Sequence, residues 1–443
     1  MPDGSRTPPL RVNWFSPLRP ANTAIASYAL RTVQALARHA EVTVWAERAY
    51  WPRELDVCAR VHRWDGQSWH ILNTADATFF HLGNNALFHG WIWDVARRHP
   101  GIVVLHDTRL HEFFAPMLLE GSGGEAAYLA DVRRVHGEAA VREATRMLRG
   151  DTLIHSLAES VPLTALAVER ARGAIVHASE GFREVAALGL CPVLQLDLPY
   201  EAGGSPPTRT WDGTLRMVLF GYLGPNRRIE SLLDAIAAFP DRDRLRLEIL
   251  GQHRDPSAIT DRIKALNLGE RVTFRGFVPE SELNEALDRA HLAVNLRYPT
   301  MGEASDSQLR IWSRGLASVV TRTGWYAELP PEAVWFVDPA NEAADLQTHF
   351  AAALARPDAL RAMGETGRGV LEERHDPARY VDGLVEGVRR MMGPPVSVIG
   401  HATRAISRIA EEGGIRGEAR ASIARRTAGE LCRWLSPRNE VDA

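Results

Sequence analysis

The chain has 443 residues, a formal net charge of −3 and 45% hydrophobic residues. That length exceeds what one ordinary core supports, so two domains of about 200 residues each are expected. The nearly balanced charge excludes a general nucleic-acid binder, because the basic patches of such proteins usually raise the isoelectric point well above neutrality. The three cysteines are far apart and form no Cys-x-x-Cys pair, so neither a disulfide framework nor a zinc site is indicated.

The sequence also gives no sign of membrane insertion or export. No apolar run approaches the length needed to span a bilayer. Residues 1–10 lack the apolar core of a signal peptide. We therefore expect a cytoplasmic protein.

Residues 11–195 alternate short apolar runs with segments of helical periodicity, of which 25–38 and 87–98 are examples. The expected strands are 10–15, 41–45, 77–82, 102–106, 174–177 and 193–196. Alternation of this kind predicts a parallel sheet with helices on both faces.

A second alternating series begins near residue 216. Its expected strands are 217–220, 247–250, 272–274, 292–296, 319–321 and 334–337. The stretch 201–213 between the two series is rich in glycine, proline and polar residues, so it reads as a linker. The predicted fold class is therefore α/β, with a Rossmann-like domain over 1–200 and a second one over 214–376, facing each other across a cleft.

The most informative stretch is 299–330. The apolar run before it ends at a Tyr-Pro pair, and the loop that follows carries one carboxylate, Glu303. Ser305 and Gln308 have the Ser-x-x-Gln spacing of a helix N-terminus, and Gly315 supplies the stop. The predicted helix covers 306–314. Its free backbone amides and positive dipole end form a natural seat for an anionic group such as a phosphate.

This stretch resembles the donor-site motif of retaining GT-B glycosyltransferases, in particular family 4. Members read Pro-Ser-x-x-Glu-Gly-Phe-Gly, a helix, and then Gly-x-Pro-Val-Val-x-Thr with a glycine shortly after. Here 315–321 and Gly324 follow that order, with Ala317 in place of the proline. The resemblance implies that Glu303 contacts the donor sugar. Ile311 occupies the place of a second family glutamate that usually holds the nucleotide ribose, and Arg310 is beside it.

The start of the second series resembles another element of the family, Gly-Arg-Leu-x-x-x-Lys-Gly, which neutralises the donor diphosphate. Gly221 opens the match, Tyr222 replaces the arginine, and Arg227 takes the place of the lysine in a chain whose only lysine is Lys264. A guanidinium binds two phosphate oxygens at once, so the resemblance implies that Arg227, aided by Arg228, holds the diphosphate. The alternative is a helix turn with solvated arginines.

The first loop of the chain matches Ser-Gly-Ile-Ala-x-Tyr in relatives, where glycine lets backbone amides approach phosphate or sugar closely. Ala24 replaces that glycine, and Thr23 precedes it. Asp306 likewise stands where relatives often keep a glycine. The expected donor-binding residues are Thr23, Ala24, Gly221, Arg228, Ser305, Asp306 and Ser307.

Strand ends supply the remaining candidates, because ligands of open α/β sheets bind beyond the carboxyl ends of the strands. His106 ends a strand in the place of a family histidine, which implies contact with the donor hexose; the alternative is a satisfied core histidine. The expected catalytic residues are thus His106, Glu303 and Arg227. The expected acceptor residues are His81, Asn84, Asn85 and Asp107, for which a structural turn is the equal alternative. His177 matches the family only loosely.

The resemblance implies a transferase that moves a hexose or deoxyhexose from a UDP-, GDP- or dTDP-sugar to a hydroxyl acceptor, on a glycan, polysaccharide or glycolipid, with retention. We expect no bound cofactor, metal or nucleic acid. The Asp-x-Asp at 241–243 lies in a polar loop and reads as surface. One alternative is a degenerate homologue that serves as a binding or scaffolding subunit of a polysaccharide assembly complex. Another is an epimerase or phosphorylase, for which Lys264 is a poor cofactor lysine.

The resemblance also implies that a helix within 377–395 crosses back to the N-terminal domain. Residues 396–443 extend beyond it, with helical spacing and many arginines. A basic amphipathic tail docks on anionic lipid at the inner face of the membrane or on a partner. The alternative is a solvated helix on its own domain, since acidic residues are interspersed.

Overall fold

The computed structural model describes residues 9–392, 406, 409–410 and 413–435. The chain divides into two units after Leu384, and the first unit contains both β-sheets. The second unit contains helix α17 (Gly417–Leu435). The predicted helix end at 393–395 and much of the predicted tail lie outside the described residues. Within the part that is described, no helix combines the length and apolar character needed to cross a membrane.

The first sheet has seven parallel strands in the order β3-β2-β1-β4-β5-β6-β7. The strands are β1 (Leu10–Phe15), β2 (Ala40–Ala46), β3 (Arg60–Arg63), β4 (Ala77–Leu82), β5 (Ile102–Leu105), β6 (Gly173–Val176) and β7 (Val193–Gln195). The six predicted strands are confirmed. Strands β4, β5 and β6 are buried on both faces, which is why they read as continuous apolar runs.

Strand β3 was not predicted from the sequence. Its residues read Arg-Val-His-Arg, and the strand lies at the edge of the sheet, where all four are partly or fully exposed. An edge strand needs no continuous apolar run, because neighbouring elements cover less of it.

Helices join the strands of the first sheet. They are α1 (Ala24–Leu36), α2 (Trp69–Leu72), α3 (Ala86–Ala96), α4 (His111–Glu120), α5 (Gly124–Leu148), α6 (Ile154–Ser160), α7 (Thr164–Val168) and α8 (Ser179–Ala187), with a 3₁₀ turn η1 (Arg53–Val57). Four of them, α4 to α7, fall between β5 and β6. The crossover between these two strands is therefore a helical subdomain rather than a single helix.

The second sheet has six parallel strands in the order β10-β9-β8-β11-β12-β13. They are β8 (Leu215–Phe220), β9 (Leu245–Leu250), β10 (Val272–Gly276), β11 (Leu292–Asn295), β12 (Ala317–Thr321) and β13 (Trp335–Val337), each at a predicted position. The helices are α9 (Ile229–Ala238), α10 (Pro256–Ala265), α11 (Glu280–Arg289), α12 (Asp306–Ser313), α13 (Glu342–Ala355) and α14 (Pro357–Arg374), with 3₁₀ turns η2 (Pro225–Arg227), η3 (Arg242–Arg244) and η4 (Gly324–Glu328).

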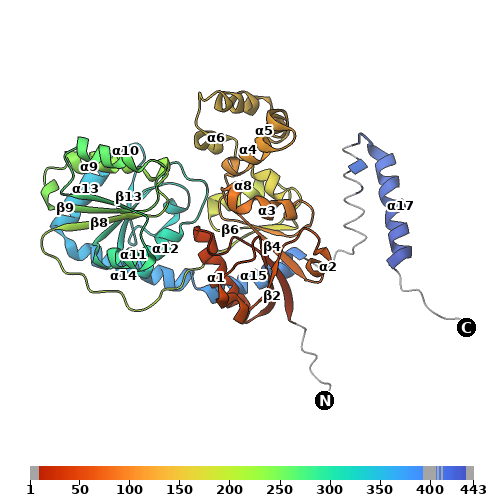
Figure 1. Cartoon of the computed structure of the whole chain (residues 1–443), viewed down its shortest axis with the longest axis horizontal. Helices are drawn as coiled ribbons and strands as arrows, with labels where there is room; N and C mark the ends of the chain where they lie inside the picture. Colours follow the sequence, from red (N-terminus) through yellow and green to blue (C-terminus); the bar gives the residue numbers. More distant parts are fainter. Residues whose placement is uncertain (1–8, 393–405, 407–408, 411–412, 436–443) are drawn as a thin grey trace, which may run out of the picture. The chain divides into compact units, whose positions relative to one another are not determined.

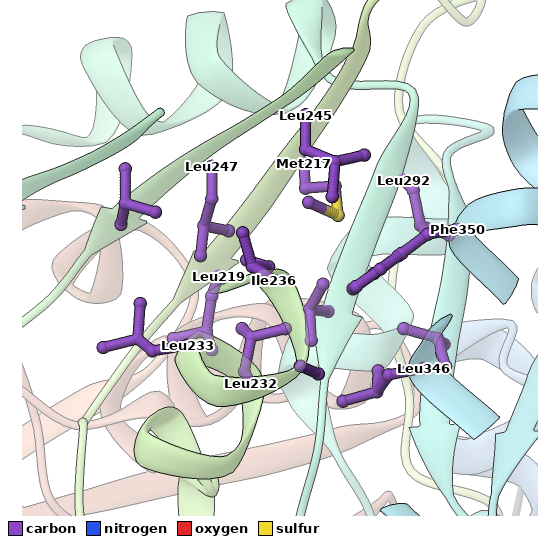
Figure 2. Packing of buried hydrophobic residues seen from close by; sticks show 14 of the residues in the cluster. Met217, Leu219, Leu232, Leu233, Ile236, Leu245, Leu247, Leu292, Leu346 and Phe350 are labelled. Carbon is purple, nitrogen blue, oxygen red and sulfur yellow. The ribbon is translucent and has the colours of Figure 1, made fainter. Parts of the chain in front are cut away.

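Helices cover both faces of the second sheet. Figure 1 shows α9, α10 and α13 on one face and α11 and α12 on the other. On the first face, leucines, isoleucines and Phe350 of the helices pack against Met217, Leu219 and Leu247 of the strands (Figure 2). On the second face, Ile311 and Leu316 pack against Val218 and other apolar residues of the sheet. Both faces of the sheet are thus covered by packed helices. A ligand can therefore bind only at the ends of the strands.

Helix α15 (Pro377–Met392) follows α14 and reaches residues of the first sheet's half. The hydroxyl groups of Tyr380 and Tyr28 share a hydrogen bond of 2.7 Å. Space there is tight, since a Cβ on Gly383 would lie 2.5 Å from a methyl group of Leu196. The helix predicted to cross back therefore contacts the half of the chain that contains the first sheet. We call this the first half, and the part that contains the second sheet the second half.

Candidate functional site

The Glu303 carboxylate is held at three points in the loop that joins β11 to α12. Its Oε2 atom accepts hydrogen bonds from Thr300 Oγ1 at 2.8 Å and from Met301 N at 2.7 Å. Its Oε1 atom lies 3.1 Å from Arg297 Nε. Only 14% of the side chain is exposed, so the loop presents one fixed carboxylate.

Arg297 was not singled out from the sequence. It lies two residues after the end of β11, and its side chain is partly buried, with 20% exposed. Burial acts to lower the pKa of Arg297, but Tyr326 and Glu303 outweigh that effect and raise it. The signal was available, because Arg297 is a charged residue at the carboxyl end of a central strand.

Helix α12 begins where the sequence predicted. Ser305 is its N-cap, and Ser305 Oγ accepts a hydrogen bond from Gln308 N at 3.1 Å. Gly315 has φ +55°, the left-handed conformation expected beyond the helix end. The Gln308 side chain does not return to the cap, because it donates to Ser318 Oγ at 2.7 Å and accepts from Asn295 Nδ2 at 3.0 Å.

A carboxylate of the chain itself stands at this helix end. Asp306 is the first residue of α12, and its Oδ1 lies 2.7 Å from Arg31 Nη2 of α1. Ser307 faces the turn after β8, where a Cβ on Gly221 would lie 3.7 Å from Ser307 Oγ. In this conformation Asp306 supplies the negative charge that the helix dipole favours.

The structure adds to the reading of Ile311 that its side chain is buried. The sequence placed Ile311 where relatives carry a ligand-binding carboxylate, but the side chain is fully buried among apolar residues of the second sheet. Its neighbour Arg310 lies on the polar side of the helix, with Nη2 2.6 Å from Asn284 Oδ1 and 3.3 Å from Glu280 Oε1. The helical phase of α12 therefore puts an arginine, not an isoleucine, toward the surface.

Both predicted phosphate-binding arginines already have partners. Arg227 is 1% exposed, and it donates to Asn295 Oδ1 at 2.8 Å and to Phe220 O at 2.9 Å. Burial lowers its pKa to about 9. Arg228 pairs with the buried Glu342 at 3.1 Å. The alternative of solvated arginines does not hold for Arg227, whose guanidinium lies inside the domain.

The turn after β8 is open to solvent at Tyr222, which is 70% exposed. It is also tightly packed, since a Cβ on Gly251 would lie 1.9 Å from Gly221 O. Gly251 has φ +156° and Gly221 has φ +110°, so both positions favour glycine.

Three predicted histidines meet at the carboxyl end of the first sheet. His81 Nδ1 lies 3.1 Å from His106 Nε2, and the rings of His106 and His177 have centroids 5.3 Å apart. Tyr28 packs edge-on against His106. All three imidazoles are buried, and burial lowers the pKa of each, to about 4 for His177.

Asp107 lies next to His106 at this edge and interacts electrostatically with Glu303. Asp107 Oδ2 accepts a hydrogen bond from Asn84 N at 2.8 Å. Burial raises its pKa to about 7, and the charge of Glu303 adds to the shift. Asn84 Oδ1 accepts from Phe113 N at 3.0 Å. The charge of Glu303 therefore acts on Asp107, one of the predicted acceptor residues.

Asn85 and Thr23 have local roles as helix caps. Asn85 Oδ1 accepts from Leu87 N at the start of α3, and Thr23 Oγ1 accepts from Ile25 N at the start of α1. Ala24 is the first residue of α1. A cavity of about 290 Å³ lies under the same loop; its lining includes Ser16, Leu18, Arg48, Tyr50, Leu87 and Trp91.

Metal ligands are not assembled at this site. Among the residues that the structure describes, no group of three or more His, Cys, Asp or Glu side chains could hold a metal ion. The Asp-x-Asp at 241–243 forms part of η3, and Asp243 pairs with Arg271.

Residues 212–370 match the family model described as Glycosyl transferases group 1. This segment contains the Glu303 loop and α12, and it ends within α14. A comparison with curated proteins found no match.

Solved structures resemble the chain over most of its length. Sucrose-phosphate synthase from Thermosynechococcus elongatus is 16% identical, with a TM-score of 0.61 over 86% of this chain and 99% of that chain. Anabaena Alr3699/HepE in complex with UDP and glucose is 12% identical, with a TM-score of 0.58 over 86% of this chain and 100% of that chain. WaaG, a glycosyltransferase involved in lipopolysaccharide biosynthesis, is 13% identical, with a TM-score of 0.55 over 86% and 100%. At these identities the likeness shows the fold alone: the chain has the GT-B fold.

Proposed function

We propose that the protein is a glycosyltransferase that moves a sugar from a nucleotide-diphosphate donor to a hydroxyl acceptor. The observation that carries this proposal is the Glu303 carboxylate, fixed at three points two residues before Ser305, the N-cap of α12. A fixed acceptor of hydrogen bonds suits sugar hydroxyl groups, and a helix N-terminus suits a phosphate. The family match over residues 212–370 supports the same activity.

The three predicted catalytic residues and the start of α12 have roles in this proposal. Glu303 and His106 orient the donor sugar. The amides of 305–307 hold the diphosphate, and Arg227 acts on that end of the helix through Asn295, whose amide donates to Ser305 Oγ at 3.4 Å. Positioning and stabilisation of developing charge then account for catalysis.

The finer assignments extend the proposal. The sugar is a hexose or deoxyhexose, the family is 4-like, and the anomeric configuration is retained because the leaving diphosphate helps to deprotonate the incoming hydroxyl on the same face. UDP is our first candidate nucleotide, ahead of GDP and dTDP, since Alr3699/HepE was solved with UDP-glucose. The acceptor belongs to a glycan, polysaccharide or glycolipid.

The proposal also covers location and partners. We place the reaction in the cytoplasm, with residues 396–443 providing peripheral contact with a membrane or an assembly complex. Helix α17 carries exposed Arg425 and Arg426, which fit anionic partners.

A second candidate is a catalytically degenerate homologue that serves as a binding or scaffolding subunit. The favouring observation is that Asp306 pairs with Arg31 and Arg228 pairs with Glu342, so two charged residues predicted to bind the donor already have charged partners within the chain. A diphosphate would have to displace or tolerate the Asp306 carboxylate.

The first test is Glu303→Gln in the full chain, with a panel of UDP-, GDP- and dTDP-sugars. We expect one donor to raise the melting temperature of the wild type and to be consumed, and the variant to lose on the order of 10²-fold or more in rate. Glu285→Gln is the control, because Glu285 is exposed on α11. Donor binding without turnover would favour the scaffolding role. Turnover that Glu303→Gln leaves unchanged would overturn our assignment of the site.

A further inference from the structure

The Glu303 loop is fastened to the first half of the chain through backbone hydrogen bonds. Met301 O accepts from Thr108 N at 3.0 Å and from Arg109 N at 2.9 Å. Thr108 and Arg109 follow β5 and are buried. A Cβ on Gly302 would lie 2.0 Å from Thr108 Oγ1, so only glycine fits between the two segments. We call this contact the seam; it joins residues 108–109, 179–184, 300–302 and 328.

Arg109 is the charged centre of the seam. Its Nη2 lies 3.0 Å from Glu180 Oε1 and 3.3 Å from Glu184 Oε1, both on the first turns of α8. Its Nη1 donates to Thr300 O at 2.7 Å. The two carboxylates are four residues apart on one helix face, where they would repel each other without a cation between them. The two carboxylates therefore hold Nη2 of Arg109 in the first half, while Nη1 binds the Thr300 carbonyl of the second half.

The carbonyl that Arg109 holds belongs to the group that fixes Glu303. Thr300 contributes its carbonyl to Arg109 and its hydroxyl to Glu303, and the amide of Met301, the next residue, also donates to Glu303. A shift of the Thr300 peptide would move two of the three contacts of the carboxylate. Arg109 does not contact Glu303. The two side chains are connected through Thr300, which forms one hydrogen bond with each of them.

A reciprocal contact supports the same alignment from the other side. Glu328 of η4 caps the N-terminus of α8, since it accepts from Ser179 N at 3.2 Å, Ser179 Oγ at 2.8 Å and Glu180 N at 3.1 Å. Glu328 in the second half thereby fixes α8 in the first half, the helix that carries the two carboxylates paired with Arg109.

We propose that Arg109 is a positioning residue, which sets the Glu303 carboxylate relative to the strand ends of the first half. This inference rests on the proposed function. It differs from a phosphate-binding role, because three protein oxygens already occupy the guanidinium. Displacement of a fixed catalytic group by about 1 Å can cost on the order of 10²-fold in rate.

The test compares Arg109→Ala and Arg109→Lys with Arg134→Ala in the full chain. Arg134 is a matched control, because it also pairs with two carboxylates, Asp131 and Glu169, but lies outside the seam. We expect both Arg109 variants to lower kcat about tenfold to a hundredfold while the KM for the donor changes by less than about threefold. Arg109→Lys keeps a positive charge between the two carboxylates, so it should fold even if Arg109→Ala does not. A loss of kcat in the lysine variant then reports the lost contact with Thr300 and not unfolding.

Hydrogen exchange gives a readout that does not depend on activity. We expect the amides of Thr108, Arg109 and Met301 to exchange faster in the Arg109 variants and to be unchanged in Arg134→Ala. Unchanged exchange would overturn the inference, as would faster exchange with kcat within about twofold of wild type. If the wild type turns over no donor, the proposed function fails; exchange then decides whether Arg109 orders the Glu303 loop.

Discussion

At the scale of single residues, the rotation of α12 about its axis decides which side chains face the sheet and which face the solvent, and the spacing of the motif does not. Ile311 stands eight residues after Glu303, the spacing of two carboxylates in relatives. The side chain nevertheless points into the apolar layer between α12 and the sheet, where Val218 and Ala293 lie. A motif fixes which residues are present, but the rotation of the helix fixes which face the solvent.

We therefore expect Ile311→Glu to destabilise the fold rather than to restore a ribose contact. An unpaired carboxylate buried in that layer should cost about 4 kcal/mol or more of unfolding free energy, against about 1 kcal/mol for Ile311→Val. Urea unfolding of both variants measures the difference. An Ile311→Glu protein as stable as the wild type, with tighter donor binding, would show that the side chain reaches the ligand.

At the scale of elements, α12 is held by its cap and by α14. Ser305 closes its N-terminus, and Gly315 ends it in the left-handed conformation. Trp312 packs directly on the backbone of α14, since a Cβ on Gly367 would lie 2.2 Å from Trp312 Cδ1. The helix that presents its N-terminus to the site is thus fixed along its length by a close helix contact.

Two glycines of α14 provide a matched pair for this contact. Gly367→Ala should overpack the Trp312 contact and cost about 1–3 kcal/mol of unfolding free energy. Gly369→Ala meets no atom within 4 Å, so it should stabilise the helix by about 0.5–1 kcal/mol. Denaturant unfolding of both proteins is the measurement. A Gly367→Ala protein as stable as Gly369→Ala would mean that α12 and α14 are less tightly packed than this contact indicates.

At the scale of the whole molecule, a buried set of histidines links the first sheet to the returning helix α15. The His177 ring lies 5.9 Å from that of Tyr380, centroid to centroid, and His177 Nδ1 lies 3.0 Å from Leu196 O. Burial lowers the pKa of His177 to about 4, from an ordinary value of 6.5, and lowers that of His89 to about 4 as well. Neutral imidazoles are therefore part of the folded state.

Stability should fall as the pH drops from about 6.5 toward 4. Over that window the unfolded chain binds protons that the folded His177 does not, so the free energy of unfolding decreases with falling pH. Asp107 has the opposite effect on the free energy of unfolding. Its pKa is raised to about 7 in the folded state, so as the pH falls below about 7 the folded chain binds a proton that the unfolded chain does not yet bind.

His177→Gln should make the loss between pH 6.5 and 4 smaller, whereas exposed His39→Gln should leave it unchanged. Urea unfolding at several pH values measures both slopes. Equal slopes for wild type and His177→Gln would show that this histidine does not contribute to acid unfolding.

The sequence by itself determined the fold class, twelve of the thirteen strands found in the described residues, and the helix that Ser305 caps. These features depend on local rules: continuous apolar runs mark strands buried on both faces, and Ser-x-x-Gln with a later glycine marks the ends of a helix. Edge strand β3 was not predicted because it has no continuous apolar run. The helical subdomain between β5 and β6 was not predicted either, because no local motif indicates it.

The tertiary structure alone decided which charged groups meet. Arg297 pairs with Glu303, Asp306 with Arg31, and Arg109 with carboxylates of α8, although each pair except the first is far apart in the sequence. It also decided that Arg227 and Ile311 are buried. Partners and burial depend on how sheets and helices pack across the two halves, and packing is a property of the folded chain that no short stretch of residues contains.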